Sequence, residues 1–248
     1  MAVTKLPNPV GYNNSASRGH LNWYAPPFLT VGLNTTDINS INLDDGVAPG
    51  EGAVGWGDVM QIVGPLGNAS EIYYYYHKSN APDPTAIPNE FYWGDENCDS
   101  ISVSFDGGDG VAIDNPNEYT YSILSSGQVP SEVVEFAAHG HLNWTGNPFP
   151  AEINLNAIAL DDGVTPGEGA VGWGDVLQIV GPLGNASEIY YYYHKSNAPD
   201  PTAIDGDFYW GDENCDPVNV ILAPGAGVAI DNPNDYIYDI KITPPYSL

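Results

Sequence analysis

The sequence predicts an all-β protein built from two tandem homologous β-sandwich domains, each jelly-roll-like or a partly open barrel. Three observations carry this prediction: a long internal repeat, short segments of alternating polarity, and frequent turn residues. Residues 43–99 and 160–216 align without a gap and differ at five of 57 positions. A repeat of this length indicates a duplicated domain rather than a short solenoid unit. The 28 Gly and 22 Pro of the 248 residues favour short strands joined by turns.

The repeat extends beyond its near-identical part and sets the expected domain boundaries. Residues 19–23 match residues 140–144, and residues 110–117 match residues 227–234. We therefore expect an N-terminal arm over residues 1–18, a first domain over 19–127 and a second domain over 128–248. The seam between the domains is expected near residues 125–127.

Several segments have the pattern of β-strands. Apolar and polar residues alternate over residues 101–105 and again over 236–242, as in strands with one buried face. Residues 176–180 are mostly apolar and end at Gly181-Pro182, which is typical of a central strand. No stretch of ten residues has helical periodicity, so no substantial helix is expected.

The two copies differ just before the shared Gly-His-Leu-Asn-Trp segment. Residues 132–138 of the second copy are plausible strand material, whereas residues 11–17 of the first are rich in Asn, Ser and Gly, which disfavour strands. The first domain is therefore expected to lack an edge strand. Either another chain or the arm at residues 2–6 would fill that edge. Val3 and Leu6 are the candidate strand-exchange residues.

A tetra-tyrosine segment, residues 72–78, recurs at residues 189–195. In a strand, successive side chains point to opposite faces, so only one pair of tyrosines can enter the core. The other pair would either form an exposed aromatic surface, for a subunit interface or for stacking on sugars, or pack under a loop of its own domain. The candidate interface or glycan-stacking residues are Tyr73, Tyr75, Tyr190, Tyr192, Trp93 and Trp210.

An acidic turn at residues 94–99 recurs unchanged at residues 211–216. Several carboxylates in one turn offer oxygen ligands to Ca²⁺, although acidic turns are also simply solvated. No EF-hand spacing is present, and no cofactor other than Ca²⁺ is expected. The candidate calcium ligands are Asp95, Glu96, Asp99, Asp212, Glu213 and Asp216.

The two cysteines and the Asn-x-Ser/Thr triplets are candidate modification sites. Cys98 and Cys215 occupy equivalent positions, so they can pair with each other only if the domains meet about a two-fold axis through that turn. Otherwise they are buried thiols, free thiols or cross-links between chains. In a secreted protein the triplets would be glycan acceptors, and the candidates are Asn34, Asn68, Asn143 and Asn185.

Charge and motifs exclude several classes of function. A formal net charge of −27 opposes binding to nucleic acid and to anionic membrane surfaces. No apolar run is long enough to cross a bilayer as a helix, so membrane insertion is not expected. Residues 50–55 spell G-x-G-x-x-G. A dinucleotide site requires a strand before this motif and a helix after it, and the sequence pattern predicts neither here. No nucleophile elbow or metalloprotease motif occurs, so we do not expect an enzyme.

Two repeated phrases resemble a known type of domain. They are Gly-x-Gly-Val-Ala-Ile-Asp-Asn-Pro-Asn followed by Tyr-x-Tyr, and Asp-Val-x-Gln-Ile-Val-Gly leading into the aromatic strand. They are similar to tandem β-sandwich units in secreted surface proteins of environmental bacteria. The resemblance covers most of each repeat and implies an extracellular structural or adhesive role without catalysis.

Together these observations favour a non-enzymatic structural subunit of an extracellular filament or surface layer. The chain would associate with copies of itself, head to tail, through strand complementation and tyrosine-rich interfaces. The alternative is a tandem carbohydrate-binding module, lectin-like, that uses exposed Tyr and Trp side chains.

Overall fold

The computed structural model describes residues 10–17, 20–44, 58–63, 69–115, 121–138, 141–161, 175–180, 186–232 and 238–247. These residues form an all-β protein whose strands pair antiparallel. Within them the only helical elements are single 3₁₀ turns: η1 (Ile38–Ser40), η3 (Lys78–Asn80), η4 (Leu155–Ala157), η5 (Lys195–Asn197) and η6 (Pro201–Ala203). The prediction of an all-β fold without substantial helices is therefore confirmed for this part of the chain.

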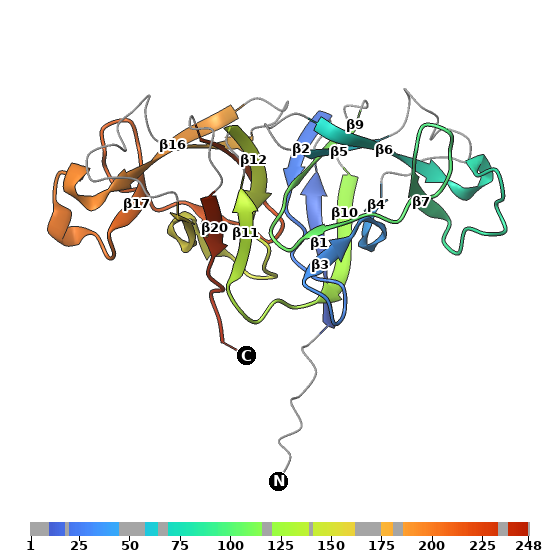
Figure 1. Cartoon of the computed structure of the whole chain (residues 1–248), viewed down its shortest axis with the longest axis horizontal. Coiled ribbons are helices and arrows are strands. Elements are labelled where there is room, and N and C mark those ends of the chain that lie inside the picture. The colour runs from blue at the N-terminus through green and yellow to red at the C-terminus, as the bar shows by residue number, and fades with distance from the viewer. Residues whose placement is uncertain are drawn as a thin grey trace, which may run out of the picture.

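The first repeat forms three sheets (Figure 1). A five-stranded sheet has the order β2 (His20–Tyr24), β9 (Val111–Asn115), β5 (Val59–Val63), β6 (Ala69–His77), β7 (Phe91–Gly94). A three-stranded sheet has the order β1 (Val10–Ser17), β10 (Tyr121–Gln128), β4 (Ile41–Asp44). A two-stranded sheet pairs β3 (Thr35–Asp37) with β8 (Ser104–Asp106).

The second repeat forms the same three sheets in the same strand order. Its five-stranded sheet runs β12 (His141–Gly146), β19 (Gly227–Asn232), β15 (Val176–Val180), β16 (Ala186–His194), β17 (Phe208–Gly211). Its three-stranded sheet runs β11 (Val134–Ala138), β20 (Tyr238–Ile242), β14 (Ile158–Asp161). Its two-stranded sheet pairs β13 (Ile153–Asn154) with β18 (Ile221–Leu222). As predicted, residues 176–180 form a strand in the middle of a sheet.

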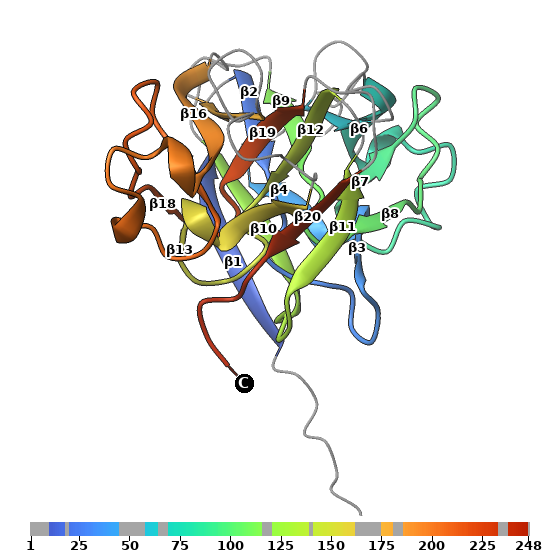
Figure 2. The ribbon, with the colours of Figure 1, turned by 60° about the vertical axis from the view of Figure 1, so that its left-hand side comes forward.

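The edge expected to be vacant in the first repeat is occupied by the chain itself. Residues 10–17 form β1, which pairs with β10 over all eight residues, from Val10 opposite Gln128 to Ser17 opposite Tyr121. β11 occupies the equivalent edge in the second repeat (Figure 2). The prediction that this segment is poor strand material was wrong, because pairing with a neighbour outweighs a weak local preference. The expected seam at residues 125–127 lies within β10.

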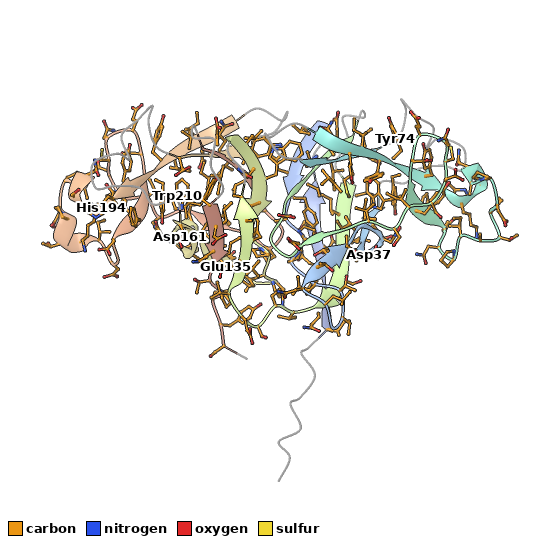
Figure 3. All side chains as sticks on the ribbon, in the orientation of Figure 1. Asp37, Tyr74, Glu135, Asp161, His194 and Trp210 are labelled. Carbon is orange, nitrogen blue, oxygen red and sulfur yellow. The ribbon has the colours of Figure 1, made fainter. Side chains whose placement is uncertain are left out.

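Each repeat buries its own apolar core between its sheets. In the first repeat the largest fully buried rings are those of Trp93, Tyr75 and Tyr24, which contact Ile and Val side chains of both larger sheets. In the second repeat Trp210 and Tyr192 take the places of Trp93 and Tyr75. Figure 3 shows Trp210 inside the second repeat, whereas His194 lies toward its outer end. The equivalent residues of the two copies thus have the same structural role.

The two repeats pack against each other through reciprocal contacts. Trp23 and Trp144 hold equivalent positions, and their rings stack on each other with centroids 6.1 Å apart. The Ala25 amide of the first repeat donates to the Gly225 carbonyl at 3.1 Å, and the Thr145 hydroxyl of the second repeat donates to the equivalent Gly108 carbonyl at 2.7 Å. Each repeat thus gives and receives similar contacts, as in an isologous interface that closes on itself. Figure 1 shows β2 and β12 in the middle, with β7 and β17 at opposite ends.

Two equivalent glycines allow this close approach. A Cβ atom on Gly110 would lie 2.7 Å from the Thr145 nitrogen, and one on Gly227 would lie 2.3 Å from the Trp23 carbonyl carbon. Both distances are shorter than non-bonded carbon contacts allow. The repeated Gly that precedes Val-Ala-Ile-Asp-Asn is therefore required by the contact between the repeats.

Candidate functional site

Four of the six predicted interface or glycan-stacking residues lie in the core. Tyr75 and Trp93 are 2% and 1% exposed, and Tyr192 and Trp210 are 4% and 0% exposed. The Trp93 Nε1 atom donates to the Ile41 carbonyl at 2.7 Å, and the Leu43 amide donates to the Tyr75 hydroxyl at 3.2 Å. These rings have no exposed face for a sugar or a second subunit, so their assignment as surface residues was wrong. They are instead the main aromatic packing of each core.

The other two predicted stacking residues are half-buried. Tyr73 and Tyr190 pack against the cores of their repeats, and each hydroxyl donates to a carboxylate two residues earlier, Glu71 or Glu188. Burial and that carboxylate raise the pKa of Tyr73 to about 12. The side chains at these two positions therefore keep only a limited exposed surface.

The opposite face of each tyrosine strand packs under a loop of its own repeat, which is the second of the two alternatives derived from the sequence. Tyr76 and Tyr92 form a buried cluster with Ala81 and Ile87, and Tyr74 lies against it. The Tyr76 hydroxyl donates to the Asp95 carbonyl at 3.0 Å. The tyrosines thus fix the loops beyond β6 and β7 in place. Tyr193, Tyr209 and Ala198 form the same cluster in the second repeat.

The acidic turns are organised by one carboxylate each. Asp95 accepts hydrogen bonds from the backbone amides of Asn97 at 2.9 Å and Asp99 at 3.0 Å, which hold the pKa of its carboxyl below the ordinary value. Asp212 makes the same two bonds in the second repeat. Glu96, Asp99, Glu213 and Asp216 are exposed. Among the residues that the structure describes, no group of three or more His, Cys, Asp or Glu side chains could hold a metal ion. The calcium prediction stays a prediction.

The two cysteines lie in these turns, near opposite ends of the molecule. Cys98 and Cys215 are half-buried and not in disulfides. Their backbone is left-handed, with φ 64° in both copies. The Cys98 carbonyl accepts a hydrogen bond from the Tyr92 hydroxyl at 2.7 Å, so the turn is tied to the strand below it. The repeats do meet in a two-fold manner, but about Trp23 and Trp144 rather than about the cysteine turns.

The remaining predicted sites lie partly outside the described residues. Val3, Leu6, Asn68 and Asn185 are among the residues that the structure does not describe. Asn34 lies in an exposed loop and is accessible to a glycan. Asn143 lies in β12, where its Nδ2 atom is 3.4 Å from the Tyr238 hydroxyl, so a glycan there would have to replace that contact.

The two outer lobes of the molecule are near-copies of each other. We define the first outer lobe as residues 78–103 with the ends of β6 and β7, and the second as residues 195–220 with the ends of β16 and β17. The tyrosine hydroxyls make equivalent hydrogen bonds in the two lobes. In the first lobe, Tyr76 donates to the Asp95 carbonyl and Tyr92 to the Cys98 carbonyl. In the second lobe, Tyr193 donates to the Asp212 carbonyl and Tyr209 to the Cys215 carbonyl. One chain therefore presents nearly the same surface at both ends.

A cavity between the repeats was not foreseen from the sequence. It has a volume of about 390 Å³ and lies between β1, β2 and the loop before β19. Its lining residues are Asn13, Asn14, Ser15, Asn22, Trp23, Tyr24, Ile123 and residues 223–226. The Asn- and Ser-rich composition of residues 11–17 was the available signal, but it was interpreted as weak strand propensity.

Comparisons of the chain with models of protein families, with curated proteins and with solved structures gave no match. No helix in the described part of the chain is long and apolar enough to cross a membrane.

Proposed function

We propose that this chain is a non-enzymatic structural subunit of an extracellular filament or surface layer, formed by two tandem β-sandwich domains. The observation that carries the proposal is the presence of near-identical outer lobes at opposite ends of one chain. A lobe-to-lobe contact between two chains uses one end of each and leaves the other end free. Such a contact extends an assembly without closing it.

The proposal differs from the sequence-based hypothesis in where subunits meet. β1 occupies the sheet edge at which strand complementation was expected. The surfaces around Trp23 and Trp144 cover each other within one chain, so they are not free to bind a second chain. The outer lobes remain as repeated surfaces. Their exposed residues are largely acidic or polar, so the net charge of −27 opposes contact until salt or a divalent cation screens it. The charge and the resemblance to bacterial surface repeats support an extracellular location.

Negative-stain electron microscopy at low and high salt, with and without millimolar Ca²⁺, tests whether the protein polymerises. We expect filaments or sheets at raised ionic strength. Dispersed particles under every condition, or polymers only at low salt, would contradict the proposal.

A pair of substitutions tests whether the outer lobes are the contact. Ala86 and Ala203 are exposed at equivalent positions, one in each lobe. Ala86→Glu or Ala203→Glu alone should leave one functional end and limit assembly to dimers, whereas the double variant should be monomeric. Ala137→Glu, an equal change at an exposed position of β11, is the control and should polymerise. Normal polymers from the double variant would reject lobe-to-lobe assembly.

A further inference from the structure

The two sides of the interface between the repeats are built differently, although the repeats are homologous. On one side lies the 390 Å³ cavity, which we call the neutral cavity because none of the described residues that line it carries a charged side chain. On the equivalent opposite side lies a 130 Å³ cavity with Asp106 and Glu135 among its lining residues, and a 380 Å³ cavity whose lining includes Glu132 and Val134 adjoins it. The difference is notable in a chain with a net charge of −27.

The sequence difference between β1 and β11 produces this asymmetry. β1 pairs with β10, and β11 pairs with the equivalent strand β20. In this register Asn13 and Asn14 of β1 are equivalent to Val134 and Glu135 of β11. On the β11 side, Val134 and Phe136 reach into the interface, and a Cβ atom on Gly108 would lie 2.7 Å from Val134. Apolar side chains therefore fill the interface beside β11. Short polar side chains leave it open beside β1.

The polar groups beside β1 are held in place by hydrogen bonds. The Asn13 Nδ2 atom donates to the Ser15 hydroxyl at 2.7 Å, and that hydroxyl donates to the Pro224 carbonyl at 3.1 Å. The Tyr24 and Ser125 hydroxyls are 2.6 Å apart. Residues of both repeats thus form the walls, and these hydrogen bonds hold Asn13, Ser15 and Tyr24 in place.

The chemistry of the lining selects a class of ligand. Asn side chains both donate and accept hydrogen bonds, which suits hydroxyl groups, and Trp and Tyr supply apolar surface with one polar atom. The volume is near the lower end of the range for small-molecule sites, about 300–1,000 Å³.

We propose that the neutral cavity binds an uncharged saccharide of one or two rings. A charged ligand would find no ionic partner among the described lining residues, and an anion would also be repelled by the acidic protein. The site does not involve the outer lobes, so this proposal is independent of filament formation. It also differs from glycan stacking on Tyr75 and Trp93, which lie in the core.

Isothermal titration calorimetry tests the proposal with glucose, galactose, mannose, N-acetylglucosamine, maltose and cellobiose as probes. At least one should bind saturably with one site per chain, and glucuronate and glucosamine should bind at least about tenfold more weakly. No saturation by any neutral sugar up to about 50 mM would overturn the proposal. A neutral acetylated dipeptide serves as the non-sugar probe. Equal binding of the charged sugars, or binding of the dipeptide but of no neutral sugar, would overturn the proposal as well.

Three substitutions, each taken from the equivalent position of the second repeat, localise the binding. Asn13→Val removes an amide from the wall, and Asn14→Glu places a carboxylate in it. Each should weaken binding about tenfold or more. Tyr12→Val is the matched control on the same strand, since Tyr12 is 82% exposed and does not line the cavity, and it should bind normally. Circular dichroism checks each fold, and wild-type affinity in both folded cavity variants would refute this site.

Discussion

At the scale of single residues, the carboxyl group of Asp109 stands out because it is partly buried next to a second carboxylate, that of Asp106. Asp109 lies in the turn between β8 and β9, where the second repeat has Ala226. Burial, together with the nearby Asp106 carboxylate, raises the pKa of Asp109 from 3.8 to about 7. The Asp109 Oδ2 atom accepts a hydrogen bond from the Asp106 amide at 3.1 Å. Its neighbours Gly108 and Gly110 both bond to the second repeat, so this turn is part of the interface.

The raised pKa predicts a pH dependence of stability. Between pH 4 and 7 the folded state binds a proton on Asp109 that the unfolded state does not, so the stability from this group falls as pH rises through that range. Asp109→Asn keeps an oxygen acceptor and removes the charge. It should raise the free energy of unfolding by roughly 2–4 kcal/mol at pH 8 and change it little at pH 4. Urea unfolding at both pH values measures this, and equal effects at the two would contradict it.

The paired tyrosine hydroxyls give a second prediction at this scale. Tyr76→Phe removes the bond to the Asp95 carbonyl and should cost about 1 kcal/mol of unfolding free energy. Tyr193→Phe is the matched change in the second repeat, where the bond to Asp212 has the same length of 3.0 Å. Because the two sites are far apart, the effects should add in the double variant. Thermal unfolding of the single and double variants measures these losses of stability. Strongly unequal losses for Tyr76→Phe and Tyr193→Phe would show that the loops of the two outer lobes differ in stability.

At the scale of elements, the sequence predicted the positions of strands better than it predicted which strands pair with each other. The alternation over residues 236–242 and the apolar run over 176–180 correspond to β20 and β15. The strand β1 was missed because it depends on pairing with β10, more than 100 residues away in sequence. The tyrosine strands were found, but alternation alone could not tell a surface face from one covered by a loop.

The close approach of β2 and β12 to the opposite repeat gives a prediction for an element. Gly110→Ala and Gly227→Ala each place a methyl group within 2.8 Å of the backbone atoms of the other repeat. Each should lower the unfolding free energy by about 1–3 kcal/mol, since overpacked backbone has to move. Denaturant titration of both variants measures the loss. A loss at neither position would show that the interface between the repeats adapts freely.

At the scale of the whole molecule, duplication and reciprocal packing together explain why the chain resembles a dimer fused into one polypeptide. The stacked Trp23 and Trp144, and the equivalent Gly110 and Gly227, are the same residue types on both sides of the interface. This arrangement could not be derived from the repeat alone, because homologous domains also pack by translation. The two repeats differ on the flanks of the interface, where β1 is rich in Asn and Ser and β11 buries Val134 and Phe136.

The reciprocal interface predicts the behaviour of a separated repeat. A chain of residues 129–248 contains both sides of the contact, since Trp144 would meet Trp144 of a second copy and Gly227 would face its backbone. Val134 and Phe136 would fill both flanks of that interface, whereas in the intact chain they fill only one. We therefore expect this fragment to form a two-fold dimer that raised salt strengthens by screening its acidic surface. Analytical ultracentrifugation should detect the dimer at micromolar concentration, and Trp144→Glu should dissociate it. A folded fragment that stays monomeric at every salt concentration would show that the covalent connection, rather than the interface, holds the repeats together.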